Sequence, residues 1–286
     1  MERYRLTGKV KKLIAEAERI AERKNHRFIQ SVDLFIGASQ VKEGTLLEMH
    51  HLVEENVHLL DEYGAHEKNE CGQGSWPFSL PLSAEARTIW MSAVEIMKRY
   101  NQIYLNEGHV LKAFFRVAEK EESALSALRA MDYEKLYQTV TAARDLIVYL
   151  PGSEWNVEKV PSVNIRQAST EDREDVVSFV RSRFGEEWGR TIQNGFSTPS
   201  GGIPIFIAEE DGELIGFAAF DVYLKKKGVY GPMGVIPEHR ESGVGKKLLY
   251  AALNEMKNQD YMYAVLKEAG PVEFYEKVCD AKLIPL

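Results

Sequence analysis

Residues 235–246 read Val-Ile-Pro-Glu-His-Arg-Glu-Ser-Gly-Val-Gly-Lys. An apolar, β-branched strand, Val229 to Ile236, stops at Pro237, and a glycine-bearing turn then opens a helix predicted over Lys246 to Lys257. The first N–H groups of a helix have no partner inside it and carry the positive end of its dipole, so they converge on one spot. Because glycine has no side chain, phosphate oxygens can approach the backbone there. The stretch therefore predicts an anion site between a strand and a helix.

The spacing Arg240-x-x-Gly243-x-Gly245 resembles the pyrophosphate loop of the GNAT-family N-acetyltransferases, whose pattern is Arg/Gln-x-x-Gly-x-Gly/Ala. The resemblance implies acetyl-CoA as cosubstrate, with its pantetheine arm along the strand that precedes the loop. The residues that match the family's cofactor-binding positions are Met233, Gly234, Val235, Arg240, Glu241, Ser242, Gly243, Val244, Gly245 and Lys246.

The rest of residues 163–286 follows the order of elements of that family. A strand (163–168) and a helix reaching Phe184 precede two strands, 203–209 and 213–223, which are joined by the turn Glu210-Asp-Gly212. The strand and helix around the glycine loop come next, then a strand (261–267), a short helix (272–278) and a last strand (281–286). The resemblance implies an α/β fold with a mixed, mostly antiparallel sheet.

The run Phe274-Tyr-Glu-Lys-x-Cys-x-Ala281 also resembles the family's Phe-Tyr-x-Lys helix. This match implies that Tyr275 donates a proton to the departing CoA thiolate. The alternative is an aromatic ring that only packs against the sheet.

The base that accepts the proton of the amine is less well specified. A lysine-type ammonium has a pKa of about 10.4, so a side chain or a water chain must take its proton before attack. Among the acidic residues near the ends of the predicted strands, we expect Asp221 or Glu209 to act. Glu210, Glu238 and His239 are further candidates, and a solvated surface role is the alternative for each of these side chains.

Two departures from the family pattern stand near the end of the sequence. The family places an asparagine before its last helix, where this chain has Lys267-Glu-Ala-Gly-Pro271. The sequence given also stops at Leu286, about one strand earlier than in most relatives, so we expect an exposed sheet edge that another protomer or the helical domain covers. The segment Gly185–Gly202 is expected to lie over the acceptor pocket and to select the substrate.

The first half reads as helical and contains an internal repeat. Apolar residues recur every three or four positions in two segments that align at an offset of 76 residues, with Thr7 matching Ser83 at the two helix starts. The match continues beyond the helices, where Ile29 aligns with Leu105. We expect two copies of a helical unit that bury their apolar faces against each other, with Ser31 capping the second helix of the first copy.

The turn His26-Arg-Phe-Ile29, the run Ser31-Val-Asp-Leu-Phe-Ile-Gly37 and the run Glu107-Gly-His-Val-Leu-Lys-Ala113 resemble the N-terminal domain of the Clp chaperone ATPases. Asp33 and Gln102 stand where that family usually has histidine. The resemblance implies an eight-helix double repeat that docks a protein partner or substrate. The chain lacks the Gly-x-x-x-x-Gly-Lys-Ser/Thr loop of an ATPase.

We therefore expect a helical domain over residues 1–148, a linker over 149–162 and an acetyltransferase domain over 163–286. The stretch Glu67 to Pro81 between the two copies reads as a loop. Trp76 and Phe78 within that loop are expected to anchor it in the core, with partner binding as the alternative.

Composition excludes several classes of protein. The net charge of −7 and the lack of a basic excess in either half of the chain argue against a nucleic-acid binder. Two isolated cysteines, Cys71 and Cys279, and scattered histidines predict neither a disulfide framework nor a metal site. We see no signal peptide and no apolar run long enough to span a membrane, so we expect a cytoplasmic protein.

These observations predict an N-acetyltransferase that moves an acetyl group directly from acetyl-CoA to an amine. The acceptor is either a protein lysine or a small amine, and the acidic charge suits any cationic acceptor. The alternative is a CoA-binding sensor without turnover, or a module that docks partners through its helical domain. The expected open sheet edge leaves a homodimer as a further option.

Overall fold

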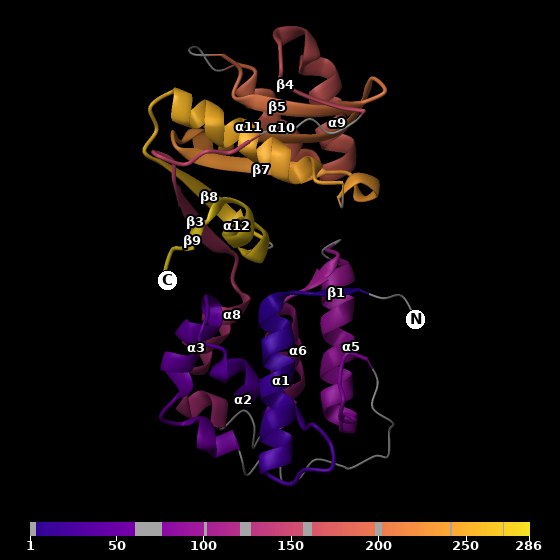
Figure 1. The fold of residues 1–286 in the computed structure, drawn as a ribbon, viewed down its shortest axis with the longest axis vertical. Coiled ribbons are helices and arrows are strands. Elements are labelled where there is room, and N and C mark those ends of the chain that lie inside the picture. The colour runs from indigo at the N-terminus through magenta and orange to yellow at the C-terminus, as the bar shows by residue number, and fades with distance from the viewer. Residues whose placement is uncertain are drawn as a thin grey trace. The chain divides into compact units, whose positions relative to one another are not determined.

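The computed structural model describes residues 4–60, 76–99, 102–120, 127–156, 162–197, 202–240, 242–270 and 272–286. The chain divides into two compact units, residues 1–142 and 143–285. Figure 1 shows a helical unit and a unit built on a sheet. Each unit is described by itself below. Within the described residues, no helix combines the length and the apolar character that a membrane span requires.

The first unit contains helices from both predicted copies. Its elements are β1 (Arg5–Leu6), α1 (Gly8–Arg23), α2 (Ser31–Gln40), α3 (Thr45–Val53), η1 (Val57–Leu60), α5 (Ala84–Arg99), β2 (Tyr104–Leu105), α6 (Glu107–Ala118) and α8 (Tyr133–Thr141). One continuous core joins their apolar faces. Phe78 is buried in that core, whereas Trp76 is 47% exposed and packs edge-on against Tyr4.

The predicted duplication is confirmed by reciprocal backbone pairing. Leu6 pairs with Leu105, and Ile29 bridges Leu82, so a shift of 76 residues converts each pair into the other. The helix caps repeat in the same way, because the Thr7 hydroxyl accepts from the Val10 N–H at 3.2 Å and the Ser83 hydroxyl accepts from the Ala86 N–H at 3.1 Å.

The cap of α2 corrects one detail of the prediction. Gln30, not Ser31, is the N-cap residue, and the Asp33 carboxylate accepts from the Gln30 N–H at 2.9 Å. The same oxygen lies 2.9 Å from Nδ1 of His26. His26 matches the Clp pattern and Asp33 departs from it, so these two positions are in contact.

The second unit contains a seven-stranded sheet with the order β4-β5-β6-β7-β8-β3-β9. Among the described strands of this sheet, β7 and β8 alone pair in parallel, so the predicted mixed, mostly antiparallel sheet is confirmed. The strands are β3 (Arg144–Tyr149), β4 (Val163–Gln167), β5 (Ile205–Glu210), β6 (Glu213–Phe220), β7 (Val229–Val235), β8 (Tyr263–Ala269) and β9 (Lys282–Leu283). The helices are η2 (Thr170–Asp172), α9 (Arg173–Phe184), α10 (Glu186–Gly195), η3 (Tyr223–Lys225), η4 (Pro237–His239), α11 (Val244–Asn258) and α12 (Val272–Cys279).

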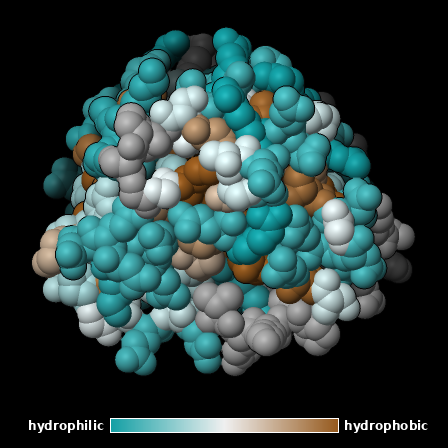
Figure 2. Space-filling view, turned by 90° about the horizontal axis from the view of Figure 1, so that it is seen from above, coloured by the Kyte–Doolittle hydropathy of each residue, from teal (hydrophilic) through white to brown (hydrophobic). Residues whose placement is uncertain are grey.

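Both faces of this sheet are covered. Alternate residues of β6 point to opposite sides, as the pleat requires. Phe217 and Ala219 belong to the core that includes residues of α9 and α10, and Ala218 and Phe220 belong to the core that includes residues of α11 and α12. The molecular surface seen in Figure 2 is mostly hydrophilic, and the hydrophobic residues coloured there form small groups separated by polar side chains.

Strand β3 differs from the prediction. We expected residues up to 148 to belong to the helical domain and a linker to begin at 149, but the structure places the boundary after Ala142. Leu146 and Val148 are buried while Ile147 and Tyr149 are more exposed, which is the alternation of a strand in a sheet. The expectation that the helical domain reaches residue 148 is therefore wrong at its end.

The same strand corrects the expected open edge. β3 lies between β8 and β9 and pairs antiparallel with both. The edge of β8 is covered by the first strand of this unit itself, and no other protomer is needed for it. The predicted last strand (281–286) is reduced to the two residues of β9.

Candidate active site

The parallel strands β7 and β8 part from each other after a short contact. They pair only at Val229 with Val265 and at Tyr230 with Leu266. Beyond that point β7 contains Gly231, at a φ of +119°, and Pro232, which has no N–H group to donate to a ladder. The two strands therefore part beyond this pair, and the sheet is open beside residues 231–235.

The alternation along β7 decides which peptide groups face this opening. The Ile236 N–H donates to the Ile215 carbonyl at 3.0 Å, and Gly234 lies opposite Phe217 of β6. In an antiparallel pair, every second residue bonds to the neighbouring strand and the others point away from it. Ile236 and Gly234 therefore bond toward β6, and the peptide groups of Met233 and Val235 face the opening.

Gly234 has a packing role on one face of the sheet. A Cβ atom at this position would lie 2.5 Å from Cε1 of Phe184. The Phe184 ring stacks on Trp188, at 5.8 Å between ring centroids, and meets Phe217 edge-on. The glycine that we assigned to cofactor binding is thus required by the close approach of an aromatic ring.

The loop after β7 ends at an uncapped helix terminus. Gly243, the N-cap residue of α11, has a φ of +83° and makes no side-chain cap, and the first turn contains no acidic residue. Nothing lies within 4 Å of a Cβ built at Gly243, and at Gly245 such an atom would meet only Cγ2 of Val235, at 3.6 Å. The N–H groups of the first turn can therefore receive an anion.

The side chains of the loop stabilise it from within. The Arg240 Nε donates to the Val235 carbonyl at 3.2 Å, and the Ser242 hydroxyl donates to the His239 carbonyl at 2.7 Å. The Lys246 ammonium lies 5.3 Å from the centroid of the Tyr250 ring. Glu241 lies outside the described residues.

Tyr275 lies on α12 in the same core as Tyr230 and Cys279. Burial raises the pKa of the Tyr275 hydroxyl well above its ordinary value, with a smaller contribution from Cys279. The pKa of the fully buried Tyr230 is raised for the same reason, and its hydroxyl lies 2.9 Å from Sδ of Met233. Both phenols remain protonated at neutral pH, so Tyr275 can donate a hydrogen bond but gives up its proton less readily than an exposed tyrosine.

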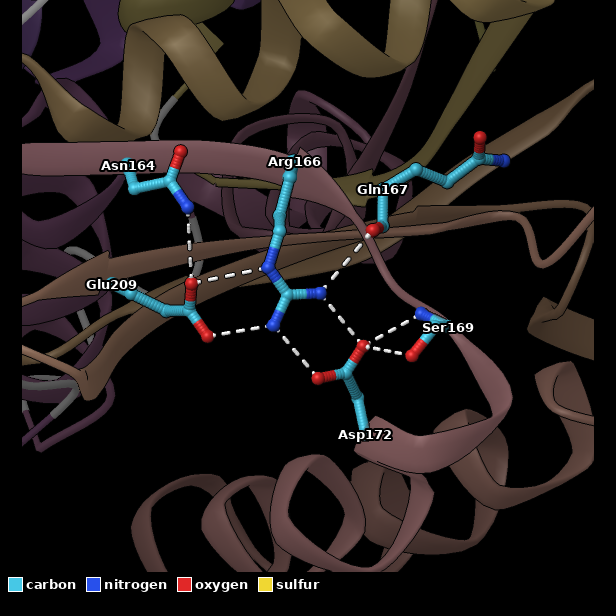
Figure 3. A network of polar contacts seen from close by, with 6 residues as sticks. All are labelled: Asn164, Arg166, Gln167, Ser169, Asp172 and Glu209. Atoms are coloured by element: carbon cyan, nitrogen blue, oxygen red, sulfur yellow. Dashed lines mark hydrogen bonds and ion pairs between the residues drawn. The ribbon is translucent and has the colours of Figure 1, made fainter.

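Glu209 is engaged at the far side of the sheet. Its carboxylate accepts from Nε of Arg166 at 3.1 Å and from Nη2 at 2.8 Å, and the Asn164 amide donates to it at 3.2 Å (Figure 3). The same guanidinium binds Asp172, whose pKa is held well below its usual range by that contact. β5 lies two strands from β7, about 10 Å away at the usual strand spacing. The structure therefore does not bring Glu209 to the opening.

Asp221 is buried at the closed end of the same strands. Its carboxylate accepts from the Gly228 N–H at 2.7 Å, from the Tyr261 hydroxyl at 2.6 Å and from the Lys227 ammonium at 3.0 Å. Its own N–H donates to the carbonyl of Val229, where β7 begins. These bonds tie the β6–β7 connection to the start of β8, and they leave the carboxylate with a structural task.

Two further residues, Glu268 at the opposite, open end and Tyr223 in the β6–β7 connection, were not expected from the sequence. Glu268 lies two residues beyond the last β7–β8 pair, and the Tyr223 hydroxyl donates to its Oε1 at 3.2 Å. We treated the run that contains Glu268 only as a departure from the family's asparagine. Within the described residues, no group of three histidine, cysteine or acidic side chains is arranged to hold a metal ion.

Residues 165–280 match the model of the Acetyltransferase (GNAT) family. This stretch is therefore a GNAT acetyltransferase domain, and members of that family use acetyl-CoA as the acetyl donor. The comparison with curated proteins gives no match.

Three solved structures illustrate the similarity of the two halves. A GCN5-related N-acetyltransferase from Sphaerobacter thermophilus has 15% identity, covers 62% of this chain and 64% of its own, and has a TM-score of 0.42. A fungal multi-domain GH3 β-N-acetylglucosaminidase, with a GCN5-related glucosamine N-acetyltransferase region, has 15% identity over 56% of this chain and 22% of its own, with a TM-score of 0.42. The Hsp104 N-terminal domain from Candida albicans has 13% identity over 48% of this chain and 89% of its own, with a TM-score of 0.35. This chain thus spans less than two thirds of each of the two acetyltransferase structures.

Proposed function

We propose that this chain transfers the acetyl group of acetyl-CoA directly to a primary amine. The observation that carries the proposal is the opening between β7 and β8 beside the uncapped N-terminus of α11. An opening of this kind gives an extended ligand unpaired backbone groups on one side and an anion site at its end.

The residues present suit acetyl-CoA. The peptide group of Met233 is suited to bond an amide of the pantetheine arm, beside the Val235 carbonyl that Arg240 already holds. The N–H groups of Val244, Gly245 and Lys246 suit the pyrophosphate, and the open space beside Gly243 lets its oxygens approach the backbone. Arg240 holds the loop in shape through its bond to the Val235 carbonyl.

Acetyl-CoA supplies a thioester, and an ammonium acceptor plus acetyl-CoA gives an acetamide, CoA thiol and one proton. The Val235 N–H is suited to polarise the thioester carbonyl as negative charge develops on its oxygen. Tyr275 is suited to hold a hydrogen bond to the sulfur that leaves. Since burial raises the pKa of Tyr275 far above that of a thiol, which is about 8.5, we expect this tyrosine to stabilise the thiolate while solvent supplies the proton.

For the helical unit we propose that it docks a protein partner or protein substrate, as its similarity to a Clp-type N-terminal domain suggests. A CoA-binding sensor without turnover is the competing function. It differs from the enzyme in one measurable respect, because it would bind acetyl-CoA and release no thiol in the presence of amines.

The test is a steady-state assay of thiol release with small primary amines and with lysine-containing peptides as acceptors. Direct transfer requires both substrates on the protein at once, so the double-reciprocal lines should intersect. Parallel lines would indicate an acetylated enzyme intermediate and contradict direct transfer. Binding of acetyl-CoA without thiol release for any acceptor would favour the sensor.

A further inference from the structure

The open end of β8 carries a carboxylate beside the proposed acyl site. Leu266 is the last residue of β8 that pairs with β7, and its partner is Tyr230. Glu268 lies two residues beyond that pair, on the part of β8 that no longer pairs with β7. Glu268 therefore lies on the wall of the opening that faces the proposed thioester-binding strand.

Contacts from β3 fix this end of β8. Glu268 has a φ of +49°, in the left-handed region that residues other than glycine rarely adopt. Its N–H donates to Oδ1 of Asp145 at 2.9 Å, and Oδ2 of the same aspartate pairs with the Lys267 ammonium. The Lys267 ammonium is thus paired with Asp145, and it attracts the Glu268 carboxylate at longer range.

The Glu268 carboxylate has a hydrogen-bonding partner of its own. The hydroxyl of Tyr223, from the connection between β6 and β7, donates to Oε1 at 3.2 Å. Burial raises the pKa of Tyr223, and the negative charges of Glu268 and of Glu187 in α10 raise it further. Glu268 itself is exposed, so its carboxylate can accept hydrogen bonds from a molecule that enters from solvent.

We propose that Glu268, assisted by Tyr223, binds the acceptor amine, and that the acceptors are therefore amines that are cationic at neutral pH. This assignment rests on the proposed acetyl transfer. The ammonium donates to the Glu268 carboxylate and loses one proton to it, and the neutral nitrogen then forms the bond to the acetyl carbon as the carbon–sulfur bond breaks. The nitrogen loses its second proton to solvent, solvent protonates the CoA thiolate, and Glu268 returns its own proton to solvent, so the products are the amide, CoA thiol and one proton. Asp221 and Glu209, in contrast, are held by cationic and hydrogen-bonding partners away from the opening.

The test compares two classes of acceptor in the full-length protein. One is an alkylamine, which is cationic at neutral pH, and the other is an aromatic amine, which is neutral. Glu268→Gln keeps the shape of the side chain and removes its charge. Glu213→Gln is the matched control, because Glu213 is also exposed and lies at the start of β6, in the hairpin that joins β5 to β6.

We expect Glu268→Gln to raise the KM of the alkylamine at least tenfold, to change the KM of the aromatic amine less than twofold and to leave acetyl-CoA affinity unchanged. Glu268→Asp, which keeps the charge, should recover part of the alkylamine KM, and Tyr223→Phe should raise that KM by a smaller factor than Glu268→Gln. If Glu268→Gln affected both acceptor classes equally, or neither of them, the acceptor-binding role of Glu268 would be overturned. Turnover by the wild type would in that case leave the proposed function standing. Absence of wild-type turnover with every amine would overturn the proposed function itself.

Discussion

Substitution of Gly243 by glutamate tests the anion site at the start of α11. A Cβ atom at Gly243 meets nothing within 4 Å, so the new side chain causes no clash. Its φ of +83° is unfavourable for any residue with a Cβ, which should cost about 1–2 kcal/mol of stability. A carboxylate about 5 Å from a bound phosphate charge repels it by roughly 1–3 kcal/mol, for effective dielectric constants between about 80 and 20. CoA affinity should therefore fall by about 5- to 150-fold.

The chain contains a matched control for the backbone cost. Gly212, in the turn between β5 and β6, has a φ of +85° and also nothing within 4 Å of a Cβ. Gly212→Glu should lose similar stability and retain wild-type affinity for CoA. Calorimetric titration of CoA into the three proteins, with thermal unfolding alongside, separates the two effects. Equal affinity in all three proteins, or equal weakening in both variants, would refute the placement of the phosphates.

Three further predictions concern the site and its support. Tyr275→Phe should lower kcat by about 10- to 100-fold and change acetyl-CoA affinity less than twofold, and loss of affinity equal to the loss of turnover would make the tyrosine structural. Gly234→Ala should destabilise the protein by about 1–3 kcal/mol in urea unfolding because its Cβ would strike the Phe184 ring. Gly245→Ala should have little effect on stability. A larger loss of stability in Gly245→Ala than in Gly234→Ala would contradict the packing described for β7. Burial lowers the pKa of His109 to about 4, below the 6.5 expected when unfolded, so the unfolded chain takes up the proton first. The free energy of unfolding should then fall as the pH drops from about 6.5 toward 4, and His109→Gln should flatten that slope.

The repeat of the first unit and the loop of the second could be predicted because their signals are local. Thr7 and Ser83 sit immediately before their helices, and each caps its helix through a backbone group three residues later. Gly243 lies at the helix start with a left-handed backbone, which is what a glycine at that place indicates. Such features depend on a few neighbouring residues and survive in any tertiary context.

Strand β3 was missed because its role depends on strands that lie far away in sequence. Residues 144–149 directly follow a helix, and only their pairing with β8 and β9 makes them a strand of the sheet. The partners of the candidate bases also lie far away in sequence. Glu209 is paired by Arg166, 43 residues earlier, and Asp221 by Tyr261, 40 residues later. Whether a carboxylate is free to act as a base is decided by partners that spacing along the chain does not reveal.

The central claim is acetyl transfer to an amine, and labelled substrate tests it most directly. The full-length protein would be incubated with acetyl-CoA carrying carbon-13 at the acetyl carbonyl and with a panel of alkylamines and lysine peptides. The account predicts that the label appears in an amide of at least one acceptor, in equal amount to the CoA thiol released, and that Gly243→Glu slows the formation of both products at acetyl-CoA concentrations below the wild-type KM. Bound acetyl-CoA that keeps all of its label with every acceptor, or label released only as acetate, would contradict it.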